Sequence, residues 1–310
     1  MGTGEFALPM FRGLGETEHD VVGLFTQPDR IGRGHHQHVN LMKESALERG
    51  IPVFQPERVN KSESLDDLRS LEADLFVVAA YGQILSDELL SIPPHGAINL
   101  HASLLPRHRG AAPVHYSILS GDEQTGVTIF QIEPKLDAGP ILGVVRTPIG
   151  SQETSGELEK RLAELSVPLT TTVIDQLDTG TARRLPQDTS QATLAPRMKK
   201  SLGLIDWTKT SAKVDCHVRA MQPWPSPYTF LRISDNRSLR LKVLAVGRYD
   251  VSSDADPGTV VVADGARLVA KTGDGAVELI RLQPEGKRIM DAAEFLRGHT
   301  VTQGDRFDVV

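Results

Sequence analysis

The sequence predicts an α/β fold: a doubly wound, mostly parallel, Rossmann-like sheet followed by a small, OB-like β-barrel. Two observations carry this prediction. In the first 180 residues, short apolar runs alternate with stretches whose apolar residues recur at helical spacing, which is typical of a sheet covered by helices. After residue 205, short strand-like runs follow one another with Gly or Asp between them, which is typical of a barrel.

The first part of the chain, residues 1–180, contains six apolar runs that we expect to be strands. They cover residues 21–26, 51–55, 74–79, 97–100, 127–132 and 141–147. Leucines and alanines at helical spacing predict one helix around 41–47, a second around 65–71 and a longer third over 153–177. This alternation of strand and helix predicts a parallel, doubly wound sheet.

The second part begins after a break in the pattern. Residues 181–204 have no periodic apolar face and are rich in Thr, Pro, Gln and Lys, so we expect a linker there. A helical stretch follows at 211–221 in the predicted second domain, residues 205–310. Its expected strands cover residues 228–233, 239–246, 259–262, 267–270 and 276–281.

Composition limits the class of protein. The chain has 310 residues, of which 39% are hydrophobic and 24% charged, so it is long enough for two globular domains. We expect a cytoplasmic protein, because no window is apolar enough to span a membrane and the start lacks the pattern of a signal peptide. The single cysteine, Cys216, lies in an amphipathic segment, and we expect it to pack in the core rather than act as a nucleophile.

Charge is distributed unevenly along the chain. The formal net charge is −6, which argues against a general nucleic-acid binder. From residue 190 onward, however, 18 Lys and Arg residues stand against 14 Asp and Glu residues. A mildly basic second domain suits local docking of a polyanion, although an excess of four charges is also common on solvated surfaces.

A polar pair interrupts the end of the expected strand at 97–100. Asn99 and His101 are two residues apart, so their side chains point to the same face and can converge on one ligand atom. In open α/β sheets, ligands bind beyond the carboxyl ends of the strands. The spacing alone therefore predicts either a ligand site or a pair that caps the strand and satisfies a loop.

Several separated motifs follow one another in the order of a known family. They are TQPDR at 26–30, VAAYG at 78–82, LPRHRGAAP at 105–113, TGVTI at 125–129, LDAG at 136–139, IDW at 205–207 and PWP at 223–225. Together they resemble the folate-dependent formyltransferase family. The RGAAP run is most similar to the members that act on methionyl-tRNA, and the resemblance extends from Gly2 to about Gly298.

The resemblance implies a function and a set of site residues. The chain would transfer the formyl group of 10-formyltetrahydrofolate to the amino group of methionyl-tRNA, as a monomer and without a metal ion. Asn99, His101 and Asp137 match the catalytic residues of the family. Ser103, Leu104, Leu105 and Pro106 match its folate-lining motif, and the barrel would help to hold the initiator methionyl-tRNA.

Formyl transfer needs stabilisation of the developing oxyanion, transfer of a proton and orientation of the group that carries that proton. A different residue can perform each task. Asn99 can donate its amide to the oxygen on which negative charge develops. Because its ordinary pKa lies near 6.5, His101 can donate to the same oxygen when protonated, or move a proton between the attacking and leaving nitrogens when neutral. Asp137 would orient His101 and favour its charged form. Without the resemblance, Leu-Asp-Ala-Gly is also an ordinary turn in which the aspartate bonds its own backbone.

A loop at residues 30–38 combines two glycines with Arg30, Arg33 and three histidines. The resemblance aligns Arg33 with an arginine that contacts the tRNA acceptor end. Two family lysines are replaced here by His35 and His36, which weakens phosphate contacts near neutral pH. Zinc binding by His35, His36 and His38 is a rival interpretation, but Gly and Gln offer no rigid support for the ligands. A solvated loop without a ligand is the third interpretation.

The start of the chain departs from the family. Residues 1–7 match the turn after the first strand, and the apolar strand that should precede Gly2 is absent. A central strand contributes roughly 1.5 to 3 kcal/mol for each fully buried side chain. We therefore expect either an unstable protein or a true start upstream of Met1.

Two other classes of function remain open at this stage. A related enzyme could formylate a sugar nucleotide or an amino sugar, or could hydrolyse formyltetrahydrofolate, and acceptor competition would separate these activities. A noncatalytic RNA- or folate-binding protein is the second class. The presence of Asn99, His101 and Asp137 argues against it.

Overall fold

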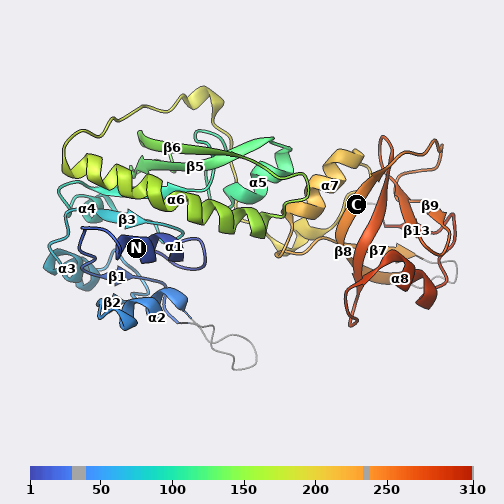
Figure 1. Ribbon diagram of the computed structural model, residues 1–310, viewed down its shortest axis with the longest axis horizontal. Helices are drawn as coiled ribbons and strands as arrows, with labels where there is room; N and C mark the ends of the chain where they lie inside the picture. The colour runs from blue at the N-terminus through green and yellow to red at the C-terminus, as the bar shows by residue number, and fades with distance from the viewer. Residues whose placement is uncertain (30–39, 233–237, 309–310) are drawn as a thin grey trace. The chain divides into compact units, whose positions relative to one another are not determined.

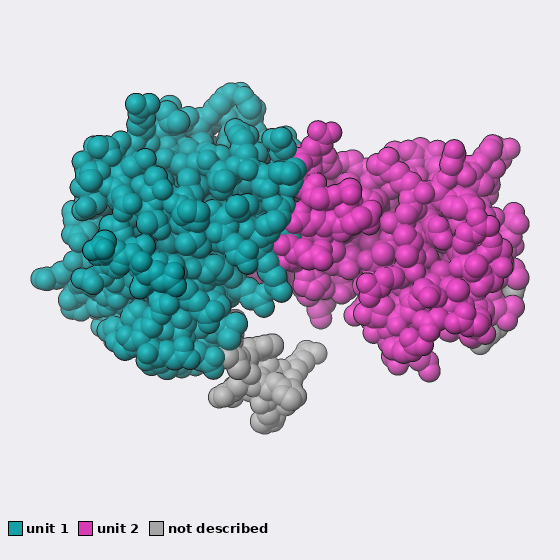
Figure 2. All heavy atoms as spheres, in the orientation of Figure 1, with its two compact units in different colours: residues 1–113, 124–148, 158–196 teal, residues 114–123, 149–157, 197–310 magenta. Residues whose placement is uncertain are grey.

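The computed structural model describes residues 1–29, 40–232 and 238–308, and the chain forms two compact units (Figure 2). Unit 1 comprises residues 1–113, 124–148 and 158–196. Unit 2 comprises residues 114–123, 149–157 and 197–310. Residues 181–196, inside the segment predicted to be a linker, thus belong to unit 1.

The sheet of unit 1 is built in two parts (Figure 1). A parallel pair consists of β1 (Leu24–Phe25) and β2 (Val53–Phe54). The second part has the order β3-β4-β5-β6, and its strands are β3 (Phe76–Val78), β4 (Ala97–His101), β5 (Gln124–Gln131) and β6 (Ile141–Pro148). β3 and β4 are parallel, whereas β5 and β6 form an antiparallel hairpin beside β4. The predicted α/β class and all six predicted strands are confirmed.

Helices of unit 1 follow from the apolar spacing and from local caps. The three predicted helices are α2 (Leu41–Glu48), α3 (Ser62–Ser70) and α6 (Ser155–Asp178). The Asn40 side chain caps α2 by accepting from the Lys43 amide, which satisfies an otherwise unpaired donor. Two shorter helices, α1 (Leu8–Leu14) and α4 (Asp87–Leu90), were not predicted, because each has at most two turns and little periodicity.

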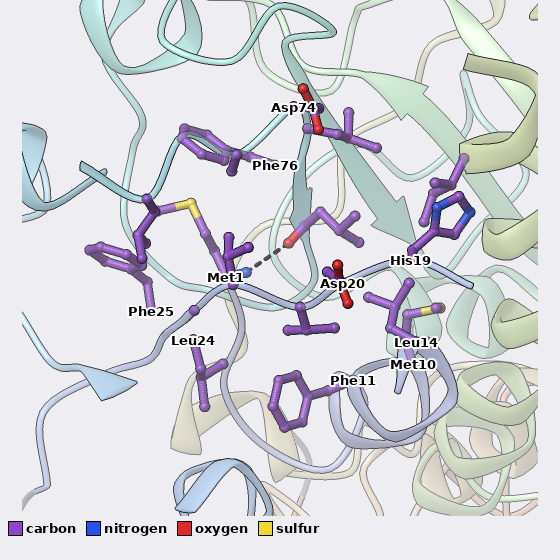
Figure 3. A pocket seen from close by; sticks show the side chains of 18 of the residues that line it. Met1, Met10, Phe11, Leu14, His19, Asp20, Leu24, Phe25, Asp74 and Phe76 are labelled. Carbon is purple, nitrogen blue, oxygen red and sulfur yellow. Dashed lines mark hydrogen bonds between the residues drawn. The ribbon is translucent and has the colours of Figure 1, made fainter. Parts of the chain in front are cut away.

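A cavity of about 430 Å³ separates β1 from β3 (Figure 3). Residues 21–25 line one side and residues 73–77 the other, and Met10, Phe11 and Leu14 of α1 close it. At its end, the Met1 amine donates to the Val77 carbonyl and the Ala79 amide donates to the Met1 carbonyl, while the Gly2 amide donates to the Phe25 carbonyl. Met1 and Gly2 therefore bond to both neighbouring strands as one rung of a parallel strand would.

This cavity gives a stability prediction. Joining Val-Ile-Val-Ile to the Met1 nitrogen is expected to fill the space with a strand parallel to β1 and β3, and to raise the Tm by roughly 5 to 15 °C. Burying each side chain contributes roughly 1.5 to 3 kcal/mol, and ordering each residue costs roughly 1 to 2 kcal/mol. Burial also lowers the pKa of the Met1 amine to about 5, and a peptide N–H would replace that group. Thermal unfolding measures the effect.

The matched control is a Ser-Gly-Ser-Gly extension of the same length. It can form the same backbone hydrogen bonds but has no apolar side chains to bury, so its Tm should stay close to that of the parent chain. Equal Tm values for the two extensions would contradict the proposed filling of the cavity.

Unit 2 is an antiparallel barrel with helices. Its path has the order β13-β7-β8-β11-β10-β9, and a bridge between Thr259 and Arg306 brings the two ends of the path together. The strands are β7 (Tyr228–Arg232), β8 (Ser238–Tyr249), β9 (Val260–Ala263), β10 (Leu268–Lys271), β11 (Ala276–Pro284), β12 (Met290–Asp291), which pairs with β11, and β13 (Arg306–Phe307). The predicted barrel is confirmed.

Two residues of unit 2 singled out in the sequence, Trp207 of the IDW motif and Cys216, are both buried. Trp207 is fully buried, stacks on Phe307 and donates its indole N–H to Thr229. Cys216 lies buried in α7 (Ser211–Ala220), as predicted. The other α-helices in the described ranges are α5 (Pro113–Ser120) and α8 (Ala292–Gly298), and short 3-10 helices lie at Thr189–Gln191 and Lys200–Gly203. None of the helices in the described ranges is long and apolar enough to cross a membrane.

Candidate active site

β4 carries the polar pair into the centre of the four-stranded sheet. It lies between β3 and β5, with Asn99 opposite Val78 on one side and Phe130 on the other. Ile98 and Leu100 are buried on one face of β4, and the alternation of a strand puts Asn99 and His101 together on the opposite face. Asn99 is half-buried, and its side chain has no hydrogen-bond partner among the residues that the structure describes.

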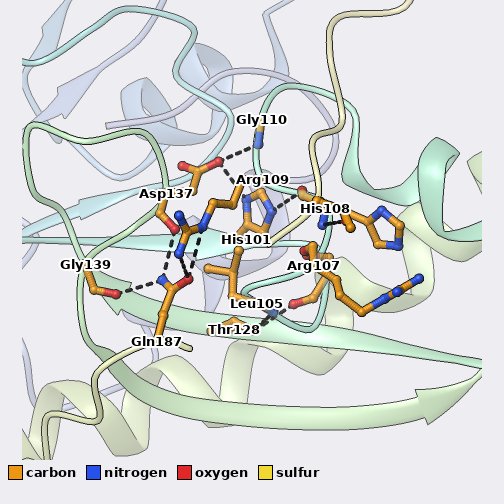
Figure 4. A network of polar contacts seen from close by, with 12 residues as sticks. His101, Leu105, Arg107, His108, Arg109, Gly110, Thr128, Asp137, Gly139 and Gln187 are labelled. Carbon is orange, nitrogen blue, oxygen red and sulfur yellow. Dashed lines mark hydrogen bonds and ion pairs between the residues drawn. The ribbon is translucent and has the colours of Figure 1, made fainter. Parts of the chain in front are cut away.

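The loop after β4 fixes the ring of His101 (Figure 4). His101 is 4% exposed, and its Nε2 lies 2.9 Å from the carbonyl oxygen of His108. Because a carbonyl can only accept, Nε2 carries the proton, and the neutral ring presents a lone pair at Nδ1. Nδ1 lies 3.7 Å from Oδ2 of Asp137. A proton taken up at Nδ1 would therefore arrive beside a carboxylate.

Opposing effects set the proton affinity of His101. Burial is the largest and lowers its pKa below the ordinary value of 6.5; the Asp137 charge and the hydrogen bond to His108 raise it, and the charges of His108 and Arg109 lower it further. The net direction is downward, so the ring is neutral at pH 7 and Nδ1 is free to accept a proton. This state is the one that a general base requires.

Asp137 belongs to the loop between β5 and β6 and is held by a different loop. Its Oδ2 accepts a hydrogen bond of 2.7 Å from the Gly110 amide. Asp137 has a φ of 45° and Gly110 a φ of 121°, both in the left-handed region. The carboxylate thus bonds across to the RGAAP run rather than only to its own turn. The structure brings two of the predicted catalytic residues, His101 and Asp137, into one pair.

The Ser103–Pro106 stretch forms a rigid loop beside this pair. The Ser103 hydroxyl donates to the Arg107 carbonyl at 2.7 Å. The Thr128 hydroxyl donates to the Ser103 carbonyl and accepts from the Leu105 amide. Ser103 and Leu105 are buried, whereas Leu104 and Pro106 are half-buried. The serine is occupied in holding the loop and is not placed as a nucleophile; the folate-lining role of the stretch stays a prediction.

The predicted tRNA contact Arg33 lies outside the described residues, as do His35, His36 and His38. Elsewhere in the chain, the described residues include no group of three or more His, Cys, Asp or Glu side chains that could hold a metal ion.

Gln187, which sequence reasoning missed, completes the polar network in Figure 4. Its Oε1 accepts from Nε and Nη2 of Arg109, at 3.2 and 2.6 Å. Its Nε2 donates to the carbonyls of Asp137 and Gly139, at 2.9 and 2.8 Å. One signal was present in the sequence: a buried arginine in the RGAAP run requires acceptors, although nothing in the sequence says which residue supplies them.

Two family models match the chain. The model described as Formyl transferase matches residues 1–180, and the one described as Formyl transferase, C-terminal domain, matches residues 197–300.

Curated relatives match over nearly the whole length. Methionyl-tRNA formyltransferase of Bacillus subtilis (strain 168) is 40% identical over 307 residues, which cover 98% of this chain and 95% of that protein. The protein of the same name from Geobacter sulfurreducens is 40% identical over 307 residues, covering 99% of this chain and 95% of the relative.

A solved structure shares the fold. It is the N-formyltransferase from Helicobacter canadensis, in complex with folinic acid and dTDP-3-aminofucose. The match has a TM-score of 0.64 at 17% identity and covers 90% of this chain and 96% of that one.

Proposed function

The chain belongs to the formyl transferase family, and we propose that it transfers the formyl group of 10-formyltetrahydrofolate to the free amino group of methionyl-tRNA. The observation that carries the proposal is the pair of buried His101 and half-buried Asp137, with Asn99 on the same strand face as His101, in a chain 40% identical to methionyl-tRNA formyltransferase of Bacillus subtilis over almost its full length. The product, formylmethionyl-tRNA, serves translation initiation.

Each catalytic residue has one task in the transfer. A bond forms between the amino nitrogen of methionine and the formyl carbon, the bond from that carbon to the folate nitrogen breaks, and one proton passes from the first nitrogen to the second. Nδ1 of His101 accepts this proton, because it has a lone pair and the ring is neutral at pH 7. Asp137 stabilises the imidazolium that results, at a distance of 3.7 Å.

Asn99 stabilises the charge that develops on the formyl oxygen. Its amide is half-buried and has no partner in the part of the chain that the structure describes, so its N–H groups are available to a ligand. A donor fixed on a strand costs no reorganisation when the charge appears, and this is the condition under which such donors act most strongly.

The loop after β4 offers surface for the folate. Leu104 and Pro106 are apolar and half-buried beside the catalytic pair, while Ser103 and Leu105 hold the backbone of the loop. A rigid, partly exposed apolar edge suits the flat ring system of a pterin. We assign residues 103–106 to the folate site; the bound co-substrate supplies the formyl group.

The tRNA partner is the initiator methionyl-tRNA, contacted by Arg33 and by the C-terminal domain, residues 205–310. The excess of Lys and Arg after residue 190 supports this role, since phosphate contacts dominate the binding of nucleic acids. The enzyme acts as a monomer in the cytoplasm, where translation initiation consumes its product.

A direct assay tests the substrate. With radiolabelled 10-formyltetrahydrofolate, the label is expected to pass to methionyl-tRNA at a kcat/KM at least 100-fold above that for a dTDP-amino sugar or for water. Transfer to the sugar, or release of formate without an acceptor, would replace the tRNA proposal with one of the other activities of the family. A single-turnover experiment without transfer to any acceptor would leave only a binding function.

A further inference from the structure

We infer that Gln187 is a positioning residue for formyl transfer, because its side chain holds the loop of Asp137 against His101. This inference rests on the function proposed above. Gln187 lies in residues 181–196, a stretch whose composition predicts only a linker, and it touches neither reacting group. It acts through the backbone of the Asp137 loop.

The contacts of Gln187 use both ends of its amide. Oε1 receives two hydrogen bonds from the Arg109 guanidinium, and Nε2 gives two, to the carbonyls of Asp137 and Gly139. An amide has two donor hydrogens and two acceptor lone pairs, so its capacity is filled. Gln187 is half-buried, while Pro186 and Asp188 on either side are exposed. The side chain is thus directed inward, into this network.

The loop that Gln187 holds needs an external support. Asp137 has a φ of 45°, a conformation that costs free energy for a residue with a Cβ atom and persists only when its surroundings fix it. The Gly110 amide fixes the carboxylate, and Gln187 fixes the backbone at two carbonyls. Loss of Gln187 removes the two side-chain hydrogen bonds to the loop backbone and leaves the Gly110 amide to hold the carboxylate.

The choice of an amide over a carboxylate also matters electrostatically. Arg109 is 5% exposed, and in the described residues no carboxylate oxygen lies within 4 Å of its guanidinium. A neutral acceptor bonds the Nε and Nη2 donors of Arg109 without competing for the proton that His101 takes up. Oδ2 of Asp137 therefore faces Nδ1 of His101, at 3.7 Å, and not the Arg109 guanidinium.

The backbone of the same segment supports this arrangement. The Leu185 amide and carbonyl exchange hydrogen bonds with Ile141, at the start of β6. Thr193 accepts from the Arg109 amide, and Ala195 donates to the Arg109 carbonyl. Residues 185–195 are thus bonded on both sides of Gln187 to the two loops that carry Arg109 and Asp137.

The test compares three variants: Gln187→Ala, Gln187→Glu and the control Gln191→Ala. Gln187→Glu keeps the acceptors for Arg109 but loses the donors to Asp137 and Gly139, so it remains informative where Gln187→Ala unfolds. Gln191 lies on the same segment and is exposed, and its amide donates only to Asp188. We expect both Gln187 variants to lower kcat by about 10- to 100-fold with little change in KM, and the control to match the parent.

A second readout does not depend on catalysis. NMR titration of the His101 ring in the Gln187→Ala protein should give a lower pKa than in the parent, because the displaced Asp137 no longer raises it. The acid limb of kcat/KM should move to lower pH by the same amount. An unchanged His101 titration would overturn the inference even where methionyl-tRNA is not the acceptor, and failure of the acceptor with a shifted titration would overturn only the proposed function.

Discussion

Replacing His101 by alanine is expected to lower kcat for formyl transfer to methionyl-tRNA by about 10²- to 10⁴-fold, the range typical for loss of a general acid or base. The ring is buried and fixed through Nε2, so Nδ1 is the atom that exchanges the proton. Because His101 acts on the transferred proton rather than on binding, KM for either substrate should change little. Steady-state kinetics of the purified variant measures both parameters.

A second His–Asp pair provides the matched control. Nε2 of His19 lies 2.8 Å from Oδ1 of Asp175, and both side chains are partly exposed. Exposed pairs of this kind contribute about 0 to 1 kcal/mol to stability. The His19→Ala variant should therefore keep the activity of the parent. Comparable losses in both variants would mean that histidine removal acts through folding, and full activity of His101→Ala would remove this residue from the mechanism.

The pH profile checks the role assigned to His101. Burial lowers the pKa of this ring below the ordinary 6.5, and the neutral form is the active base. The loss of activity caused by His101 should therefore occur as the pH falls through its lowered pKa, on the acid side of 6.5 and below the loss caused by protonation of the attacking amino group, whose ordinary pKa is about 7.7 to 8.0. In Asp137→Asn, which removes the charge that raises the pKa, the decline should begin at a still lower pH.

The spacing of apolar residues in the sequence predicted the long strands and helices, because these elements are determined by residues close together in the chain. β5 and α6 appear within a few residues of their predicted bounds because each is long and has a continuous apolar face. The direction of β5 relative to β4 is a different matter. Apolar runs of this length are compatible with either direction, and the antiparallel pairing of Leu100 with Ile129 is settled by the connection between the strands.

The candidate site shows the same division. Asn99 and His101 could be recognised as a pair because they are two residues apart in one strand. The orientation of the His101 ring could not, since it depends on where the loop places the carbonyl of His108. The contacts of Gln187 could not be predicted from the sequence either, because Gln187 lies 78 residues from Arg109 and 50 residues from Asp137. Its surroundings are polar and without period, which is the pattern of a linker.

Asn99→Ala is the second substitution with a large expected effect. Loss of the donor to the developing oxyanion should lower kcat by about 10²- to 10³-fold, equivalent to roughly 2.7 to 4 kcal/mol. Asn99→Asp should be at least as damaging, because a carboxylate in the same position repels the negative charge that forms. The His101 titration should persist in Asn99→Ala, which separates the two roles.

The Tm of the Asn99→Ala variant distinguishes a catalytic role of Asn99 from a structural one. The Asn99 amide has no hydrogen-bond partner among the described residues, and its atoms are not among the side-chain atoms that are buried there without a partner, so removing it breaks no hydrogen bond of the folded state. Asn99→Ala should therefore leave the Tm unchanged while activity falls. Asn60→Ala makes the contrast: that side chain bonds the Ile84 carbonyl and the Ser86 amide, so its loss should lower the Tm slightly and leave kcat alone. A lower Tm in Asn99→Ala, with activity reduced only in proportion to the folded fraction, would show that Asn99 stabilises the strand and takes no part in the reaction.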